Sequence, residues 1–165
     1  MDKLKEKLKQ SLAAARFQHS LRSVEIAVKL AKKHHVSIEK AALGALLHDC
    51  AKKKSGDDPL GHAAASAKLA KSLFGIKDPS VLSAIAKHTT GSPKMTPLEK
   101  IIYLADHLEE GRKYKTLAKI RQVAMKSLDQ AIVMVSSDII AFLLQQNLTI
   151  HPATIETRNY YLSKT

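Results

Sequence analysis

The sequence predicts an all-α protein, and three observations support that class. Apolar side chains recur every three or four residues along most of the chain, which is the period of an amphipathic helix, and no clear strand-like alternation competes with it. Six glycines and five prolines in 165 residues are too few for the many turns of an all-β protein. Residues that favour helix starts stand directly before several of the periodic segments. We therefore expect a helical bundle.

Three helices are expected in the first third of the chain. Residues 3–15 place leucines four apart with lysines between them, which is typical of a helix with a solvated basic face. Residues 18–34 continue the helical period, and Ser37 is placed to cap a third helix over residues 38–51. The third segment is so apolar that we expect most of it to be buried.

The middle of the chain predicts three shorter helices. The first covers residues 62–74, and the second covers residues 79–88 after the capping residue Asp78. The third covers residues 97–109. It begins after Thr96, which is followed by a proline and then by a glutamate at the position that completes a capping box.

The last part of the chain predicts a long helix and a short one. Residues 116–146 keep the helical period over a length that can contain a break, and residues 152–162 form the final helix. Two segments lack this period and contain glycine and proline, so residues 53–61 and 89–94 are expected to be loops.

The chain is strongly basic, with 27 Lys and Arg against 15 Asp and Glu and a net charge of +12. Residues 1–35 contain nine basic and three acidic side chains, which is half of the excess. A basic surface attracts polyanions, although a solvated helix face explains the same lysines. Since 165 residues suit one domain, we expect a single domain over residues 1–165, with residues 1–15 packed on it as a basic N-terminal helix.

Cys50 is the only cysteine, which excludes an internal disulfide and the Cys-rich zinc modules. We interpret it as a small core residue of a protein in a reducing compartment, and we expect a cytoplasmic location. The longest apolar stretches are far shorter than the roughly 20 residues that span a bilayer. The first residues are too charged for a signal peptide. We expect no membrane association.

Ionisable side chains interrupt two of the most apolar segments. His48 and Asp49 end the stretch that begins at Ala41, and Asp106 follows five mostly apolar residues. A buried charge is costly unless it has a partner or binds a metal. A helix cap or a salt bridge explains either position alone, but together they favour a metal site.

Three further histidines stand where a bundle can bring side chains to one point. His19 lies near a helix start, His62 opens a helix after a loop, and His88 ends a helix before a turn. Imidazole and carboxylate ligands suit iron, manganese, cobalt and zinc, whereas a soft thiolate site needs more than one cysteine.

The ordered set of these histidines and aspartates resembles the HD-domain metal-dependent phosphohydrolases, and most closely their YqeK-type subfamily. The resemblance covers nearly the whole chain and rests on four motifs. They are Leu-Leu-His-Asp-Cys-Ala-Lys at 46–52, Ala-Lys-His-Thr-Thr-Gly at 86–91, Leu98 to Asp106 running on to Glu109-Glu110-Gly111-Arg112, and Ile150-His151-Pro152 with Arg158-Asn159-Tyr160.

The resemblance implies a single HD-domain helical bundle that cleaves diadenosine tetraphosphate symmetrically into two ADP, with a metal-activated water as the attacking group. The expected cofactor is one or two divalent or trivalent metal ions, with iron first and manganese, cobalt or zinc as alternatives. The expected metal ligands are His19, His48, Asp49, His62, His88 and Asp106. We assign catalytic roles to Asp49, Lys52, His62 and His88.

Cleaving a phosphoanhydride requires cations and backbone donors that neutralise the phosphate charge. The candidate substrate-binding residues are Lys52, Thr89, Thr90, Gly91, Arg112, Arg158 and Asn159. Each has a plainer alternative: Lys52 belongs to a run of three lysines, and Arg112 can pair with Glu109. The 89–91 segment can be an ordinary turn, and Arg158 with Asn159 can simply hold the C-terminus.

The chain departs from the family pattern between residues 50 and 61, where relatives commonly carry a longer connection. If that connection closes over the substrate, this chain has a shorter lid and a more open site, which puts substrate length and selectivity in doubt. The expected partner is a dinucleoside polyphosphate or another nucleotide, nucleic acid is not required, and a homodimer is an open option. Two alternatives remain: an HD phosphohydrolase that acts on a nucleoside triphosphate, an alarmone or a phosphodiester, and a basic RNA- or ribosome-associated regulatory module.

Overall fold

The all-α class is confirmed. The computed structural model describes residues 1–52 and 60–165, and within them it contains helices and connections but no strand. Most of the expected 53–61 loop, and with it the short connection after Cys50, lies outside the described residues. The helices are α1 (Asp2–Ser11), α2 (Ala14–Lys33), α3 (Ile38–Leu47), α4 (His62–Ser72), α5 (Pro79–Ala86), α6 (Pro97–Leu108), α7 (Leu117–Ala124), α8 (Leu128–Gln145) and α9 (Pro152–Leu162).

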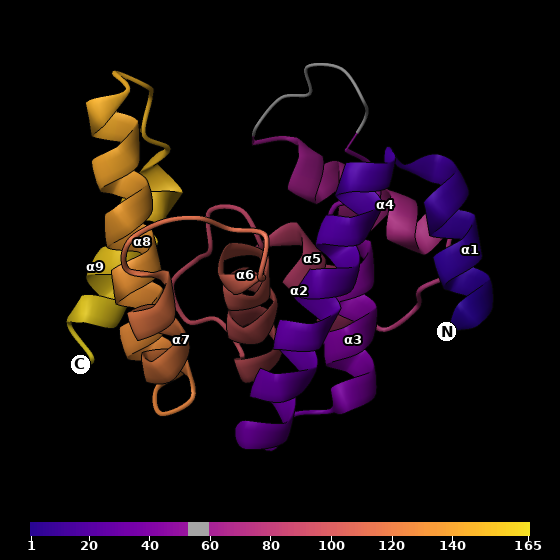
Figure 1. The fold of residues 1–165 in the computed structure, drawn as a ribbon, viewed down its shortest axis with the longest axis horizontal. Helices are drawn as coiled ribbons and strands as arrows, with labels where there is room; N and C mark the ends of the chain where they lie inside the picture. The colour runs from indigo at the N-terminus through magenta and orange to yellow at the C-terminus, as the bar shows by residue number, and fades with distance from the viewer. Residues whose placement is uncertain (53–59) are drawn as a thin grey trace.

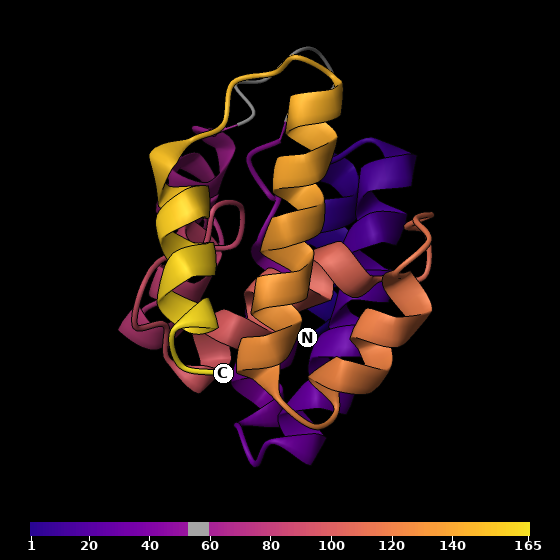
Figure 2. The ribbon, with the colours of Figure 1, turned by 90° about the vertical axis from the view of Figure 1, so that its left-hand side faces the viewer.

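Helix α6 is the centre of the bundle and contacts α2, α3, α5, α7 and α8. Four consecutive side chains of α6, from Ile101 to Leu104, are almost completely buried, because neighbouring helices cover it on several sides. The helices α8 and α9 stand side by side at one end of the molecule, and α1 lies at the other end (Figures 1 and 2). Hydrophobic burial around α6 therefore fixes the position of Asp106, which α6 carries.

The predicted boundary between the first two helices was wrong. We expected helices over residues 3–15 and 18–34, but α1 ends at Ser11 and α2 begins at Ala14. Leu12 and Ala13 are extended, with ψ angles of 156° and 146°. The break allows both Leu8 and Phe17 to be buried in the same core. In one continuous helix these two side chains would point to opposite faces, because they are nine residues apart.

The third helix is also shorter than predicted, since α3 ends at Leu47 rather than at residue 51. The next residues form turns in which the Cys50 N–H bonds to the Leu47 carbonyl and the Lys52 N–H bonds to the Asp49 carbonyl. The Ala51 N–H donates to Ser66 Oγ of α4 at 3.1 Å. These bonds replace the helical ones.

The predicted helix starts are confirmed, as Ser37 and Asp78 accept backbone N–H bonds and Thr96 forms the expected capping box with Glu99. The long 116–146 segment is broken into α7 and α8, and Ser127 caps α8. Helix α9 has the predicted bounds, 152–162.

Helix α8 bears on the expected absence of a membrane span. Among the described residues, it is long and apolar enough to cross a bilayer by length and composition alone. One such helix is weak support for a span, because core helices pass the same test, and α8 buries Ala131, Ile132 and Val135 in the bundle core. The absence of membrane association stays a prediction.

Glu99 joins two helices, and replacing it by Gln should destabilise the protein. Its carboxylate accepts bonds from Lys87 Nζ at 2.6 Å, Ser83 Oγ at 2.5 Å and the Thr96 N–H at 2.7 Å. Burial opposes ionisation of Glu99, but these bonds lower its pKa below 4.5. We expect Glu99→Gln to reduce the free energy of unfolding at pH 7 by about 1–2 kcal/mol in urea titrations.

The pH dependence tests the cause. Because the folded-state pKa is depressed, the carboxylate stabilises the fold above the unfolded pKa, and this contribution is lost as the pH falls through the folded value. The difference between wild type and Glu99→Gln should therefore shrink below about pH 4.5. Glu156→Gln, at an exposed position of α9, is the control and should have no effect. An equal loss at every pH would contradict the explanation.

Candidate metal centre

The structure brings together all six side chains that the sequence suggested as metal ligands, and all six are buried. They come from segments that are far apart in the chain. They are His19 in α2, His48 and Asp49 directly after α3, His62 at the start of α4, His88 just after α5, and Asp106 in α6.

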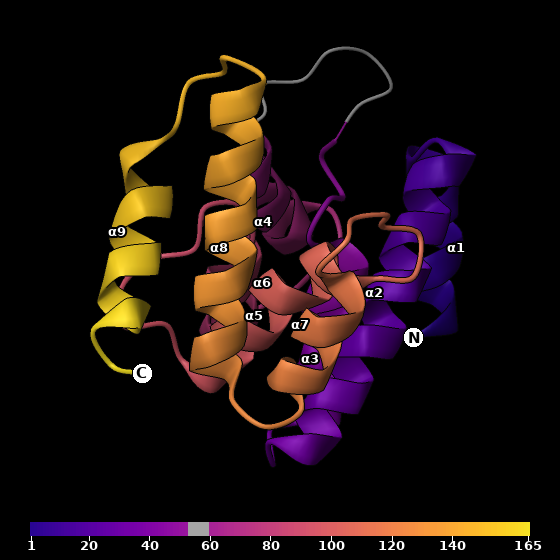
Figure 3. The ribbon, with the colours of Figure 1, turned by 60° about the vertical axis from the view of Figure 1, so that its left-hand side comes forward.

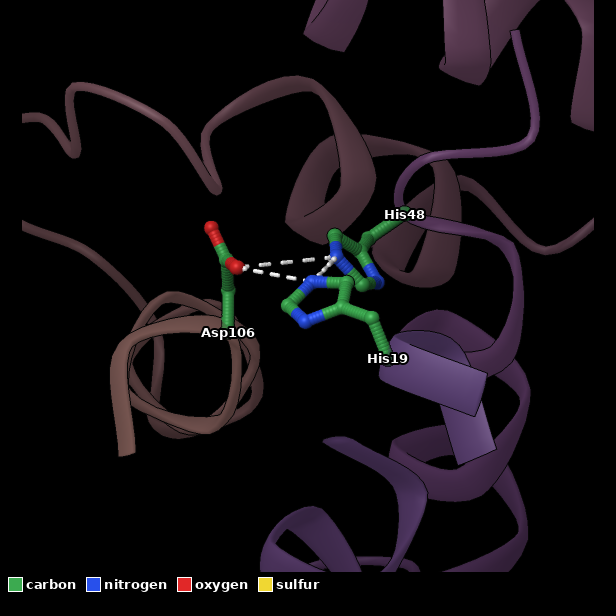
Figure 4. Close-up of side chains that lie close together, drawn as sticks. All are labelled: His19, His48 and Asp106. Atoms are coloured by element: carbon green, nitrogen blue, oxygen red, sulfur yellow. Dashed lines mark hydrogen bonds and ion pairs between the residues drawn. The ribbon is translucent and has the colours of Figure 1, made fainter. Parts of the chain in front are cut away.

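The first group consists of His19, His48 and Asp106, which point toward one another from three helical segments (Figure 4). The His19 Nε2 atom lies 3.1 Å from His48 Nε2 and 3.0 Å from Asp106 Oδ1. His48 Nε2 lies 3.8 Å from the same carboxylate oxygen. Ligand atoms about 2.1 Å from one ion are about 3–4 Å apart, so these spacings suit a shared cation.

Asp49 lies between this group and a second one. Its Oδ2 atom is 3.6 Å from His48 Nε2 and 3.8 Å from His19 Nε2. Its Oδ1 atom is 3.2 Å from His62 Nε2 and 3.4 Å from His88 Nε2. The two oxygens of one carboxylate thus face two pairs of imidazoles, which is the arrangement of a bridging ligand.

The imidazoles are oriented by their other nitrogen atoms. His48 Nδ1 lies 2.7 Å from the Ala45 carbonyl, and His88 Nδ1 lies 2.7 Å from the Ile85 carbonyl. A carbonyl only accepts, so both Nδ1 atoms carry the proton and both Nε2 atoms present a lone pair. A support of this kind fixes the tautomer that a metal-binding histidine needs.

Burial and neighbouring charges set the protonation states. Burial lowers the pKa of His48 to about 4, so this ring is neutral near pH 7. Burial opposes ionisation of Asp49, but its interactions with the imidazoles of His62, His88 and His48 hold its pKa well below the usual range. Asp106 is likewise buried, and the nearby His107 and His19 more than offset that burial and lower its pKa. The site therefore combines a neutral His48 ring with two ionised carboxylates.

The donor set fits a borderline or hard metal ion. Asp49 Oδ1 is buried and accepts no hydrogen bond within the described residues, although two imidazole Nε2 atoms face it. Imidazole and carboxylate donors of this kind suit iron, manganese, cobalt and zinc. Cys50 is close in sequence but bonds to the Ser66 carbonyl, and burial raises its pKa to about 12, so it is no thiolate ligand.

Three cationic side chains surround the carboxylates. Arg16 Nη1 lies 2.8 Å from Asp49 Oδ2, and Lys52 Nζ lies 4.0 Å from the same atom. Arg112 Nη2 lies 2.5 Å from Asp106 Oδ1, while its Nε–H donates to the Asp106 carbonyl. Each of these side chains is partly exposed, so the cations border the cluster on its solvent side.

In the 89–91 segment, Thr89 contacts the cluster, whereas Thr90 and Gly91 contact α9. Thr89 Oγ1 lies 3.1 Å from His62 Nε2 and 3.2 Å from His88 Nε2, which places this hydroxyl in the cluster. The Thr90 carbonyl instead accepts a bond from Thr157 of α9. Gly91 has a φ angle of +68°, and a Cβ there would lie 2.7 Å from Thr157 Cγ2. A glycine is therefore required for the turn and for the close approach of α9.

Arg158 and Asn159 are not brought into contact with the cluster. The Arg158 Nε–H donates to Ser137 Oγ of α8 at 2.9 Å, and its Nη1 donates to Asn159 Oδ1. Of the two readings left open by the sequence, these contacts favour the one in which the pair holds the C-terminal helix.

Sequence reasoning missed Arg16 and the buried Glu109 as parts of the site. Glu109 Oε1 lies 3.2 Å from His19 Nδ1, and its other oxygen accepts bonds from Arg22 and from the Gly111 N–H. Both had a signal in the sequence. Arg16 precedes His19 by three residues and Glu109 follows Asp106 by three, a spacing that puts each pair on one helix face.

The fold and this cluster define an all-α protein with a candidate metal centre of imidazoles and carboxylates. A family model described as HD domain matches residues 16–111. This range covers most of α2, the helices α3 to α6 and all six clustered side chains. The chain belongs to the HD domain family. HD-domain hydrolases are metal-dependent, and the His and Asp cluster of this chain is consistent with that property.

Relatives agree with this assignment along nearly the whole chain. The chain is 36% identical to a protein of Halalkalibacterium halodurans named bis(5'-nucleosyl)-tetraphosphatase, symmetrical, over 94% of this chain and 93% of that protein. It is 35% identical to a Staphylococcus aureus protein of the same name, with 98% and 94% covered.

A solved structure has the same fold. The crystal structure of a predicted HD superfamily hydrolase involved in NAD metabolism, from Clostridium acetobutylicum, superposes with a TM-score of 0.92 at 38% identity. The match covers 99% of this chain and 97% of that one.

Glu109 should tune metal affinity without being a ligand. We expect Glu109→Gln to weaken manganese binding by about tenfold, because loss of the carboxylate leaves the His19 ring less firmly oriented and less basic. Competition with a chelating dye measures this. Glu110→Gln, at the exposed neighbouring position, is the matched control. Wild-type affinity in Glu109→Gln, with Glu110→Gln equally unaffected, would contradict the role given to Glu109.

Proposed function

We propose that this protein is a metal-dependent hydrolase that cleaves diadenosine tetraphosphate symmetrically into two ADP. The observation that carries the proposal is the buried cluster of four imidazoles and two carboxylates, bordered by Arg16, Lys52 and Arg112. The similarity to proteins named symmetrical bis(5'-nucleosyl)-tetraphosphatase supports the choice of substrate.

The six clustered side chains are the proposed metal ligands. His19, His48, Asp49 and Asp106 would hold one ion, and Asp49 would bridge to a second ion near His62 and His88. When bound, the metal supplies Lewis acidity that brings the pKa of a coordinated water near neutrality. Iron is the first candidate, and manganese, cobalt and zinc are the alternatives.

The cations of this chain would bind and orient the polyphosphate. Arg112 can hold a phosphate with two parallel N–H bonds, as lysine cannot. Lys52 and Arg16 lie on the Asp49 side of the cluster, and Arg112 lies on the Asp106 side. A phosphate between them is neutralised from both sides, which lowers the barrier to attack and stabilises the departing ADP.

His62 and His88 have a second possible task. If one ion is held by His19, His48 and Asp106, the Nε2 atoms of His62 and His88 face Asp49 Oδ1 and can accept the proton that the attacking water loses. Thr89 Oγ1 is within 3.2 Å of both nitrogens and can relay that proton or bind a phosphate oxygen.

The proposals about location, oligomeric state and partners have fewer supporting observations than the proposed reaction. We also propose a cytoplasmic location, because the single cysteine is free and buried, which suits a reducing compartment. Homodimer formation, and the lack of a need for nucleic acid or membrane, stay predictions. No observation favours the alternative nucleotide substrates or a regulatory RNA-binding role over the tetraphosphate.

Product analysis tests the proposed reaction. Protein purified without chelator and supplied with iron or manganese should convert diadenosine tetraphosphate into ADP alone, as measured by ion-exchange chromatography. Symmetrical cleavage requires attack at a phosphorus next to the central bridging oxygen. ATP plus AMP would instead mean cleavage of an outer anhydride bridge, and no turnover with any of the four metals would reject the substrate.

A matched pair of variants tests the site. We expect Asp49→Asn to lower kcat by more than about 100-fold, because removing a ligand costs more than removing a group that supports one. Asp129→Asn removes a carboxylate that pairs with Lys100 Nζ at 2.5 Å outside the cluster, and it should keep wild-type kinetics. Full activity in Asp49→Asn would place the reaction elsewhere.

A further inference from the structure

A cavity of about 560 Å³ lies between the α6–α7 connection and one face of α8. Figures 1 and 3 show this connection, residues 109–116, as an arch between α6 and α7. The volume is within the usual range for small-molecule sites. We call this cavity the α8 pocket, and the residues that matter for the argument are Arg112, Lys113, Tyr114, Lys115, Ile139 and Phe142.

Arg112 links the α8 pocket to the metal centre. This side chain lines the pocket, and its guanidinium contacts both the carboxylate and the carbonyl of Asp106. His107, the next residue along α6, lines the pocket as well. A ligand in the pocket is therefore one side chain away from the cluster.

The walls of the pocket offer aromatic and aliphatic surface. The Tyr114 hydroxyl donates to the His107 carbonyl at 2.7 Å, which holds that ring in place. Phe142 is 56% exposed and lines the pocket from α8, next to Ile139. A flat aromatic base can stack on such rings, and stacking does not depend on which base it is.

The lining of the pocket includes three cationic side chains. Lys113 and Lys115 line it together with Arg112, and neither lysine has an ion-pair partner in the parts of the chain that the structure describes. The Asp138 carboxylate, the acidic group of the lining, accepts a bond from the Thr116 hydroxyl. A lining that combines apolar and cationic side chains suits a ligand that joins an aromatic part to an anionic chain.

We propose that the α8 pocket binds one nucleoside of the substrate. Its base contacts Phe142 and Tyr114, and its phosphate chain passes Lys113, Lys115 and Arg112 to reach the metal centre. This inference deepens the proposed function and rests on it. The link to the cluster through Arg112 and the positive charge of the lining favour a nucleotide over a second copy of the chain, whose own net charge of +12 would be repelled there.

Phe142→Ala tests the pocket, with Leu144→Ala as the matched control. Both side chains are exposed on α8, at 56% and 61%, so neither substitution should disturb the core, but Leu144 does not line the pocket. The probe is ADP, titrated in a calorimeter into protein at constant manganese. We expect Phe142→Ala to weaken ADP binding, and to raise the KM for diadenosine tetraphosphate, by about tenfold. Leu144→Ala should match wild type in both.

The outcomes separate this proposal from the proposed function. If wild type cleaves diadenosine tetraphosphate and Phe142→Ala has wild-type KM and ADP affinity, the pocket assignment is overturned while the function stands. If wild type does not cleave it but binds ADP in a way that requires Phe142, the pocket assignment holds while the function fails. If Phe142→Ala changes only the mass measured by light scattering, this face is an interface between copies and the assignment is overturned.

Discussion

The burial of two carboxylates beside four imidazoles is the constraint on which the rest of the structure depends. An ionised carboxylate in a protein interior is unstable unless opposite charges or hydrogen bonds compensate it. Asp49 and Asp106 both have pKa values far below the usual range, because neighbouring imidazoles and cationic side chains outweigh the effect of burial. A site with this composition is poised to hold a cation, and the surrounding helices are arranged so that their ends converge on it.

Helix ends can place side chains in a shared site, because a side chain at a helix terminus can turn away from the helix axis. His48 and Asp49 follow the early end of α3, and His88 follows the end of α5. Asp106 lies in the last turn of α6, the most buried helix, whereas His19 projects from within α2. The hydrophobic core and the candidate metal centre therefore share one element, so a substitution that loosens α6 should affect both stability and metal binding.

Most of the fold and the six clustered side chains could be predicted from the sequence. Helical period and caps such as Thr96 act locally, so the sequence reports them directly. The break at Leu12 and Ala13 could not be predicted, because it depends on burying Leu8 and Phe17 in one core. That error also hid Arg16, which lies on the same face of α2 as His19 but was placed outside the helix.

The contacts of other residues depend on tertiary geometry that spacing does not contain. Gly91 is needed for the approach of Thr157, and Arg158 binds Ser137 rather than the cluster. The α8 pocket is a further case, because its lining comes from a connection and a helix that are separated by α7. Sequence period predicts α8 as a helix, but only the packed structure shows which of its apolar side chains face a cavity.

The most direct test of the central claim is an anomalous-diffraction map of crystals grown from protein purified without chelator and supplied with manganese. The account predicts an anomalous peak about 2.0–2.4 Å from the Nε2 atoms of His19 and His48 and from a carboxylate oxygen of Asp106. A manganese peak bound elsewhere, with none within reach of these three side chains, would contradict it.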